Sequence, residues 1–182
     1  RHLFERIIDA REVDFDPSPP EELEHLVAYA DATSGALNLL ALEVLGVRDH
    51  SHEQTAAAVG TAWALTGMVR GLRHLLLTGR SPLPQDLMKK HGLTQAEMQS
   101  LKRSDALCKT VEEIAVIAMN NLDDASVKKS GRAAPALLPS VLARAYLKRL
   151  AGTGYDPFDE KNMRPLPYRA WRLMIPAFTG RI

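Results

Sequence analysis

Residues that can bind a metal ion occur at three places along the chain, and the densest is the cluster His50-Ser51-His52-Glu53. A metal site needs side chains that converge, commonly two histidines at positions i and i+4 of one helix. This cluster lies where a helix is expected to begin, so its two imidazole rings should diverge. We therefore interpret it as a polar helix cap at the surface.

The other two candidates are the adjacent carboxylate pairs Glu112-Glu113 and Asp123-Asp124. A magnesium clamp on a helix uses carboxylates three or four residues apart, because these share one face. Neighbouring residues point to different faces. Both pairs are therefore interpreted as solvated charges.

Three arginines near a loop between helices form a candidate anion site. Arg70, Arg73 and Arg80 approach the loop of residues 79–84. A guanidinium group pairs with phosphate oxygens in a fork, so a diphosphate is the ligand that this group would bind. Because the three residues are spread over three helical turns, solvated surface charges are the alternative.

Composition excludes several classes of protein. The chain has 182 residues, of which 46% are apolar and 25% charged, as in a soluble single domain. Lys and Arg number 23 and Asp and Glu 22, so the net charge of +1 argues against a dedicated nucleic-acid binder. The single cysteine, Cys108, has no partner for an internal disulfide and is expected to be a small buried residue rather than a nucleophile.

The elements that position these residues are helices, because apolar side chains recur at helical spacing almost throughout. Helices are expected over residues 1–13, 20–45, 51–77, 85–91, 95–103, 105–129, 135–150 and 168–174. The expected boundary signals are Pro20 in a first turn, C-caps at Gly46 and Gly92, and capping boxes formed by Ser51 with Gln54 and by Thr94 with Glu97. Small residues over positions 28–36 permit close approach by another helix or a ligand. The sequence therefore predicts an all-α bundle with short connections.

Residues 60–87 resemble the squalene/phytoene synthase family. The family segment reads approximately G-x-x-x-Q-L-T-N-I-L-R-D-x-x-x-D and then G-R-x-Y-L-P-x-D, and this chain keeps Gly60, Arg70 and Gly79-Arg80 in the same register. Residues 29–36 and 91–94 are similar to further family segments. The resemblance implies a prenyl-synthase-like bundle, with residues 1–182 forming one domain that corresponds to the C-terminal two-thirds of the family fold and lacks its N-terminal helices.

The resemblance also bears on catalysis. Active members of the family join two prenyl diphosphates head to head, using magnesium held by two D-x-x-x-D motifs. The second motif falls on Gly71 and Leu75, which cannot bind magnesium, and Gly67 replaces the asparagine before it. The family places the first motif upstream of Arg1. We therefore expect a catalytically degenerate protein without a cofactor, in which magnesium has a place only if prenyl transfer survives.

Within the family, the chain most resembles the branch that contains the mitochondrial complex I assembly factor and its bacterial relatives. The resemblance lies in residues 8–12, 42–47 and 155–158, and in the tail containing Pro167, Tyr168 and Trp171. It implies a scaffold or assembly role for a respiratory complex, with complex subunits or other assembly proteins as partners. The implied location is the matrix side of the mitochondrial inner membrane in a eukaryote, and the cytoplasm or the periphery of the inner membrane in a bacterium.

Several alternatives remain open at this stage. The chain can be a true prenyl diphosphate transferase that uses Arg70, Arg73 and Arg80, or a structural subunit of a larger mitochondrial assembly. A tunnel for a prenyl or lipid tail is a further possibility. Its candidate lining residues are Tyr29, Gly35, Trp63, Thr66 and Gly67. The segment of residues 171–176 mixes apolar and basic character, so it can contact a membrane or a partner, or simply pack on the bundle.

Overall fold

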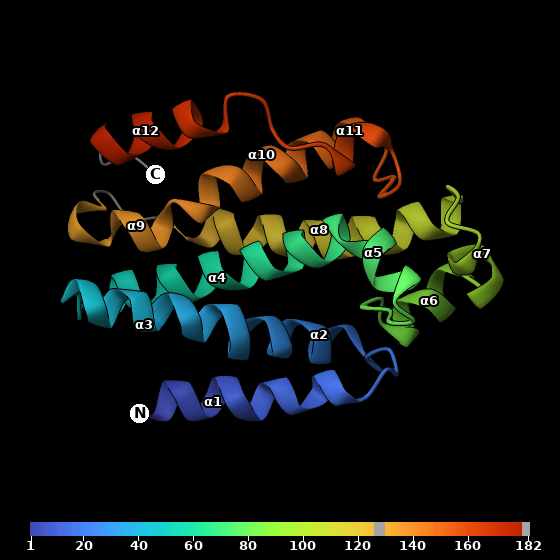
Figure 1. Ribbon diagram of the computed structural model, residues 1–182, viewed down its shortest axis with the longest axis horizontal. Coiled ribbons are helices and arrows are strands. Elements are labelled where there is room, and N and C mark those ends of the chain that lie inside the picture. Colours follow the sequence, from blue (N-terminus) through green and yellow to red (C-terminus); the bar gives the residue numbers. More distant parts are fainter. Residues whose placement is uncertain (126–129, 180–182) are drawn as a thin grey trace.

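The computed structural model describes residues 1–125 and 130–179, and these ranges contain helices, turns and loops but no strand (Figure 1). The N-terminal half contains α1 (His2–Arg11), the 3-10 turn η1 (Glu12–Phe15), α2 (Leu23–Ala30), the π-helical turn η2 (Asp31–Gly35), α3 (Ala36–Leu45), α4 (His50–Arg70) and α5 (Leu72–Leu77). The remainder contains α6 (Gln85–His91), α7 (Gln95–Gln99), α8 (Asp105–Asp124), the 3-10 turn η3 (Gly131–Ala133), α9 (Ala134–Leu137), α10 (Pro139–Gly152), α11 (Glu160–Met163) and α12 (Arg169–Thr179). The expected all-α bundle is confirmed.

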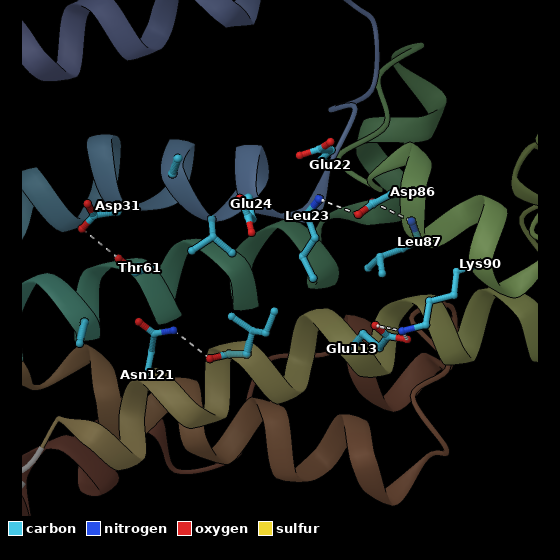
Figure 2. Close-up of a pocket in the computed structure, with 14 residues that line it drawn as sticks. Glu22, Leu23, Glu24, Asp31, Thr61, Asp86, Leu87, Lys90, Glu113 and Asn121 are labelled. Carbon is cyan, nitrogen blue, oxygen red and sulfur yellow. Dashed lines mark hydrogen bonds and ion pairs between the residues drawn. The ribbon is translucent and has the colours of Figure 1, made fainter.

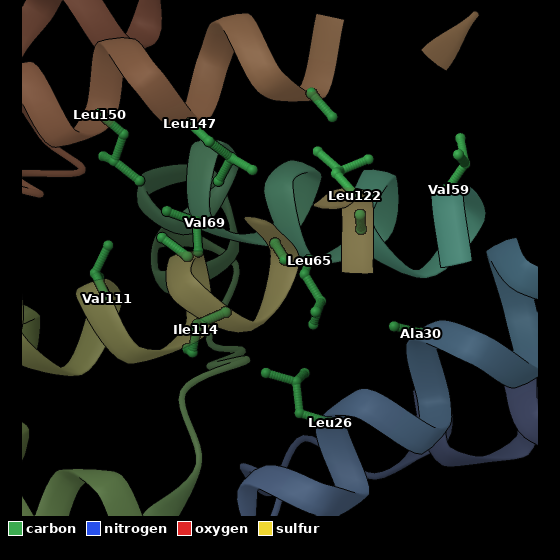
Figure 3. Close-up of a cluster of buried hydrophobic side chains, with 14 of the residues drawn as sticks. Leu26, Ala30, Val59, Leu65, Val69, Val111, Ile114, Leu122, Leu147 and Leu150 are labelled. Atoms are coloured by element: carbon green, nitrogen blue, oxygen red, sulfur yellow. The ribbon is translucent and has the colours of Figure 1, made fainter. Parts of the chain in front are cut away.

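Helix α4 is the central element of this bundle. It packs against α8, α3, α10 and the turn η2, and the long helices run side by side (Figure 1). Its buried side chains include Val59, Leu65 and Val69, which meet Ile114 and Leu122 of α8 in the main core (Figure 3). Burial of these apolar side chains is the principal source of stability of the bundle.

Two glycines allow α4 to approach η2 closely. A Cβ at Gly60 of α4 would lie 2.7 Å from the carbonyl carbon of Ser34 and 2.8 Å from the Cα of Gly35. A Cβ at Gly35 would lie 2.6 Å from Oδ1 of Asp31 and 3.3 Å from the hydroxyl of Thr61. The small residues over 28–36 therefore serve contact between helices.

Several helix boundaries are confirmed. α6 begins at Gln85 and ends before Gly92, which has a left-handed φ of +70°. The capping box of Thr94 and Glu97 starts α7, and Gly46, also at φ +70°, ends α3. The expected end of the long helix at residue 129 lies outside the described residues; α8 ends at Asp124.

Other boundaries were wrong. Pro20 does not begin α2, because its carbonyl accepts a hydrogen bond from the backbone N–H of Gln85, and the helix starts only at Leu23. Asp49 caps α4, because its carboxylate accepts from the N–H of His52, so the proposed box at Ser51 is not used.

Three further helices also differ from the expected ones. The expected helix of residues 51–77 is divided at Gly71 into α4 and α5, and that of residues 135–150 is divided at Leu138 into α9 and α10. α12 extends to Thr179, with Pro176 inside it.

Several helices leave large apolar side chains exposed, among them α1 and α12. On α1, Leu3 is buried, but Phe4 and Ile8 stay exposed. α12 has no buried residue. Within the described ranges, no helix is both long enough and apolar enough to cross a membrane.

Candidate functional site

The position of the family's second aspartate motif is a helix junction in this chain. Gly71 ends α4 and begins α5; its N–H donates to the carbonyl of Gly67 at 2.8 Å, and its own carbonyl accepts from the N–H of Leu75 at 3.0 Å. The Leu75 carbonyl in turn accepts from the N–H groups of Thr78 and Arg80 at 3.0 and 2.9 Å. The backbone is thus fully engaged in a turn that offers no carboxylate oxygen.

A magnesium ion does not fit the residues at this junction. Between Gly71 and Leu75 stand Leu72, Arg73 and His74, of which Leu72 is buried and the other two are exposed. Mg²⁺ prefers carboxylate and water oxygens in octahedral geometry, which these side chains do not supply. Across the described part of the chain, no group of three or more His, Cys, Asp or Glu side chains could hold a metal ion.

Arg70 lies at the end of α4 and stacks on an aromatic ring of α10. Its guanidinium carbon is 3.5 Å from the centre of the Tyr146 ring, and the ring also lies 5.2 Å from the guanidinium carbon of Arg149. Within the described ranges, the buried Nε atoms of both arginines lack a hydrogen-bond partner. Stacking of this kind orders a guanidinium group and leaves its edge free to bind an anion.

Two further arginines lie near Arg70. Burial lowers the pKa of Arg70, Tyr146 raises it, and the nearby charges of Arg149 and Arg169 lower it again. Among the described residues, no carboxylate is a cause of this shift. Arg149 donates to the backbone carbonyls of Asn162 and Arg164, which are neutral acceptors that leave its charge in place. The two partly buried guanidinium groups of Arg70 and Arg149 favour a bound anion such as a phosphate.

The three arginines that the sequence predicts as an anion site do not come together in the structure. Arg73 and Arg80 are exposed, and Arg80 lies where its charge acts on Asp14 and Tyr29 rather than beside Arg70. The structure places Arg149 and Arg169 near Arg70 instead. Sequence reasoning missed both residues, although the i, i+3 spacing of Tyr146 and Arg149 on one helix face was a usable signal.

The five candidate tunnel residues lie on different sides of the bundle. Trp63 packs toward Leu142, Tyr146 and Leu166, the buried Thr66 hydroxyl donates to the carbonyl of Ala62 at 2.7 Å, and Gly35 is closed off by α4. Gly67 is exposed and has no atom within 4 Å of a Cβ position.

Tyr29, the fifth candidate, is held in a polar cluster at the surface. Its hydroxyl donates to Asp14 and accepts from Arg11, each at 2.8 Å. Burial and the bond to Asp14 raise its pKa to about 12. A role in binding a lipid tail stays a prediction for all five residues.

A pocket lies elsewhere, between α2, α4, α6 and α8 (Figure 2). It is an open groove of about 1040 Å³, and none of the five tunnel candidates lines it. Its apolar wall includes Leu23, Val27, Leu87 and Ile117. Its rim carries the carboxylates of Glu22, Glu24, Asp31, Asp86 and Glu113 and the ammonium of Lys90.

Three of these five carboxylates already have partners. Glu113 accepts from Lys90 at 2.9 Å and pairs with the ring of His91 at 2.5 Å; the bond from Lys90 is the main reason that its pKa is lowered, against the opposing effect of burial. The expectation that Glu113 is simply solvated was therefore wrong. Asp31 accepts from Arg6, and Asp86 accepts from the N–H of Leu23.

The remaining candidates take structural roles. His52 pairs with the capping carboxylate of Asp49 at 2.6 Å, so residues 50–53 form the first turn of α4 and the cap is the residue just before them. Cys108 is buried, and burial raises the pKa of its thiol, as expected for a small core residue. Asp123 is exposed but forms an ion pair with Arg144.

Comparisons with known proteins agree with the fold. The profile of the squalene/phytoene synthase family matches residues 1–173. The chain is 31% identical over 177 residues to NADH dehydrogenase (ubiquinone) complex I, assembly factor 6, of Mus musculus, covering 92% of this chain and 53% of the mouse protein. It is 29% identical over 109 residues to presqualene diphosphate synthase of Rhodopseudomonas palustris, covering 59% of this chain and 39% of that enzyme.

Among solved structures, squalene synthase from Alicyclobacillus acidocaldarius superposes with a TM-score of 0.78. The identity is 21%, with 86% of this chain and 61% of that chain covered, so this similarity concerns the fold. The chain spans about half the length of the mouse relative.

Proposed function

The chain belongs to the squalene/phytoene synthase family, and within that family we propose that it is an assembly factor for a respiratory complex of the complex I type. In this role the prenyl-synthase bundle is a binding scaffold and prenyl transfer is lost. The observation that carries the proposal is the 31% identity to a complex I assembly factor over 92% of the chain.

The chemistry of the helix junction supports the loss of catalysis. Departure of a diphosphate develops negative charge that the family neutralises with magnesium. Gly71 and Leu75 supply no ligand, and their backbone groups are committed to the turn that joins α4 and α5. The chain's own cations near Arg70 can hold a diphosphate, but they do not replace a pair of metal ions.

The proposed partners are subunits of the complex or other assembly proteins. In a eukaryote the site of action is the matrix side of the mitochondrial inner membrane, and in a bacterium it is the cytoplasm or the periphery of the inner membrane. A transient assembly factor leaves the mature complex, whereas a structural subunit stays with it in fixed proportion.

Deletion of the gene in the source organism tests this role. We expect less assembled complex I on native gels and less NADH–ubiquinone oxidoreductase activity, both restored by the wild-type gene. The exposed Arg73→Gln variant is a control that should restore both. Normal complex I together with loss of an isoprenoid product would contradict the proposal, and a stoichiometric presence in the purified complex would identify a structural subunit.

A direct assay addresses the transferase alternative. Purified protein, farnesyl or geranylgeranyl diphosphate and magnesium are incubated and pyrophosphate release is measured. We expect none. Turnover that is present in the wild type and abolished by Arg70→Gln would establish the enzyme and refute the degenerate scaffold.

The environment of Arg70 favours a second function, the binding of a prenyl diphosphate without turnover. The stacked guanidinium of Arg70 and the neighbouring Arg149 and Arg169 leave excess positive charge on the α4–α10 surface. Calorimetry with farnesyl diphosphate and with uncharged farnesol should give binding of the diphosphate alone. Arg70→Gln should weaken it about tenfold or more, and equal binding of both compounds would refute an anion site.

A further inference from the structure

Helix α12 packs on the bundle with one narrow side only. Leu173 contacts the small apolar cluster of Leu142, Tyr146 and Leu166, and Pro176, one turn further on, is half-buried. These two residues are three apart and therefore share a face. The helix contacts α10 and lies at the edge of the bundle in Figure 1. The side chains on its opposite side are exposed among the described residues.

The side of α12 that faces away from the bundle is strongly apolar. Trp171, Ile175 and Phe178 recur at spacings of four and three residues, and they are 63%, 64% and 84% exposed. Tyr168 and Met174 fall on the same face and are also exposed. Advancing 100° per residue, these five residues occupy about one third of the helix circumference, opposite Leu173 and Pro176. We call this surface the outer face of α12.

The described residues of α12 carry only positive charge. Residues 165–179 contain Arg169 and Arg172 and no lysine, aspartate or glutamate. Arg169 falls on the same side of the helix as Leu173 and Pro176, whereas Arg172 lies at the border of the outer face. The Nε of Arg172 donates to the carbonyl of Pro167 at 3.3 Å, a neutral acceptor that leaves the charge in place. Cations beside an exposed apolar and aromatic face are typical of helices that lie in a membrane interface.

We propose that the outer face of α12 binds an anionic lipid surface, with the helix parallel to the bilayer plane. The apolar side chains enter the boundary between headgroups and acyl chains. Trp171 and Tyr168 lie at the level of the headgroups, where amphipathic rings are favoured, and Arg172 contacts lipid phosphates. A second copy of this face is a poorer partner, because residues 165–179 offer no carboxylate that could pair with Arg172 of the other copy.

This proposal is independent of the assembly role. It predicts lipid binding by the purified chain alone, with no respiratory partner present. Loss of lipid binding therefore refutes the inference without touching the proposed function, and a failed complementation test leaves the inference standing.

The test is co-sedimentation of the full chain with vesicles of phosphatidylcholine, with or without phosphatidylglycerol. We expect binding to the anionic vesicles, weakened by added salt. Arg172→Gln should weaken binding about fivefold, since one basic residue near an anionic surface contributes about 1 kcal/mol. Trp171→Ser with Phe178→Ser should weaken it more than about tenfold.

A matched control is the pair Phe4→Ser and Ile8→Ser on α1, whose side chains are 60% and 64% exposed. These changes should leave lipid binding unaltered, and circular dichroism of every variant verifies folding. Trp63→Phe makes Trp171 the single tryptophan of the chain, and its emission should shift to shorter wavelength on anionic vesicles. Three results would overturn the proposal: no binding by the wild type, equal loss in the α1 control, or dimerisation through α12 without lipid.

Discussion

Replacement of Gly60 by alanine tests the close contact between α4 and η2. The new Cβ would lie 2.7 Å from the carbonyl carbon of Ser34 and 2.8 Å from the Cα of Gly35, well inside the 3.4 Å at which ordinary contact begins. Both neighbours are backbone atoms, so no side chain can rotate away. The two helical segments must separate, and the buried side chains beside them lose contact.

Two opposing effects set the magnitude. Overpacking of a tight contact costs about 1–3 kcal/mol, and a backbone obstacle places this case near the upper end. Alanine favours the helix over glycine by about 1 kcal/mol. We therefore expect Gly60→Ala to lower the free energy of unfolding by about 2 kcal/mol, which lowers the Tm by about 4–8 °C for a chain of this size.

Gly67→Ala on the same helix is the matched control. Its Cβ would meet no atom within 4 Å, so only the helix preference remains, and stability should rise by about 0.5–1 kcal/mol. Urea unfolding followed by circular dichroism at 222 nm measures both variants. If Gly60→Ala is as stable as Gly67→Ala, the close approach of α4 and η2 is refuted.

Three further predictions concern single side chains. Asp49→Ala should destabilise the protein by about 1 kcal/mol because it removes the cap of α4, whereas Ser51→Ala should change stability by less than about 0.5 kcal/mol. Urea unfolding measures both variants, and equal effects would contradict the assignment of the cap. Glu113→Gln should lower stability at pH 7 by about 1 kcal/mol or less. Because the bond from Lys90 holds the pKa of Glu113 below its ordinary 4.5, this difference should vanish as the pH falls through the lowered pKa. A difference that stays constant throughout the acid titration of the protein would refute the pairing. Absorbance titration at 295 nm should show one tyrosine ionising near pH 12, and this step should be absent in Tyr29→Phe. A raised tyrosine pKa stabilises the fold below pH 10, and this stabilisation disappears as the pH rises from 10 to 12. A wild-type titration without the late step would contradict the prediction.

Local signals in the sequence were enough for elements that short-range contacts determine. α6 and its end at Gly92, and the capping box of Thr94 and Glu97, follow from residues within one turn of each boundary. The start of α2 could not be predicted in this way, because the carbonyl of Pro20 is engaged by Gln85, 65 positions along the chain. The cap at Asp49 was missed because Asp49 and Ser51 both lie near the start of the helix. Only the backbone geometry shows which of the two is the cap.

The candidate site was harder to predict than the fold. Arg70 was identified from a linear motif, but its partners Tyr146 and Arg149 come from α10, a helix far along the chain. The groove depends on how α2, α6 and α8 are arranged around α4, and the apolar periodicity of each helix does not encode that arrangement. The resemblance to a family predicted the fold and showed that Gly71 and Leu75 replace the aspartates. The residues around these two positions depend on the packing of this chain and could not be predicted from the resemblance.

The charged residues are unevenly distributed over the molecule, although its net charge is small. The net charge is only +1, yet carboxylates gather along the groove beside α2, while residues 164–182 carry arginine as their only charged residue type. α2 and α12 lie toward opposite edges of the bundle (Figure 1). This separation is an electric dipole, and in the field of a negatively charged surface a dipole experiences a torque at distances where net attraction is weak. The protein would therefore rotate its C-terminal edge toward such a surface before contact, and salt would abolish this alignment.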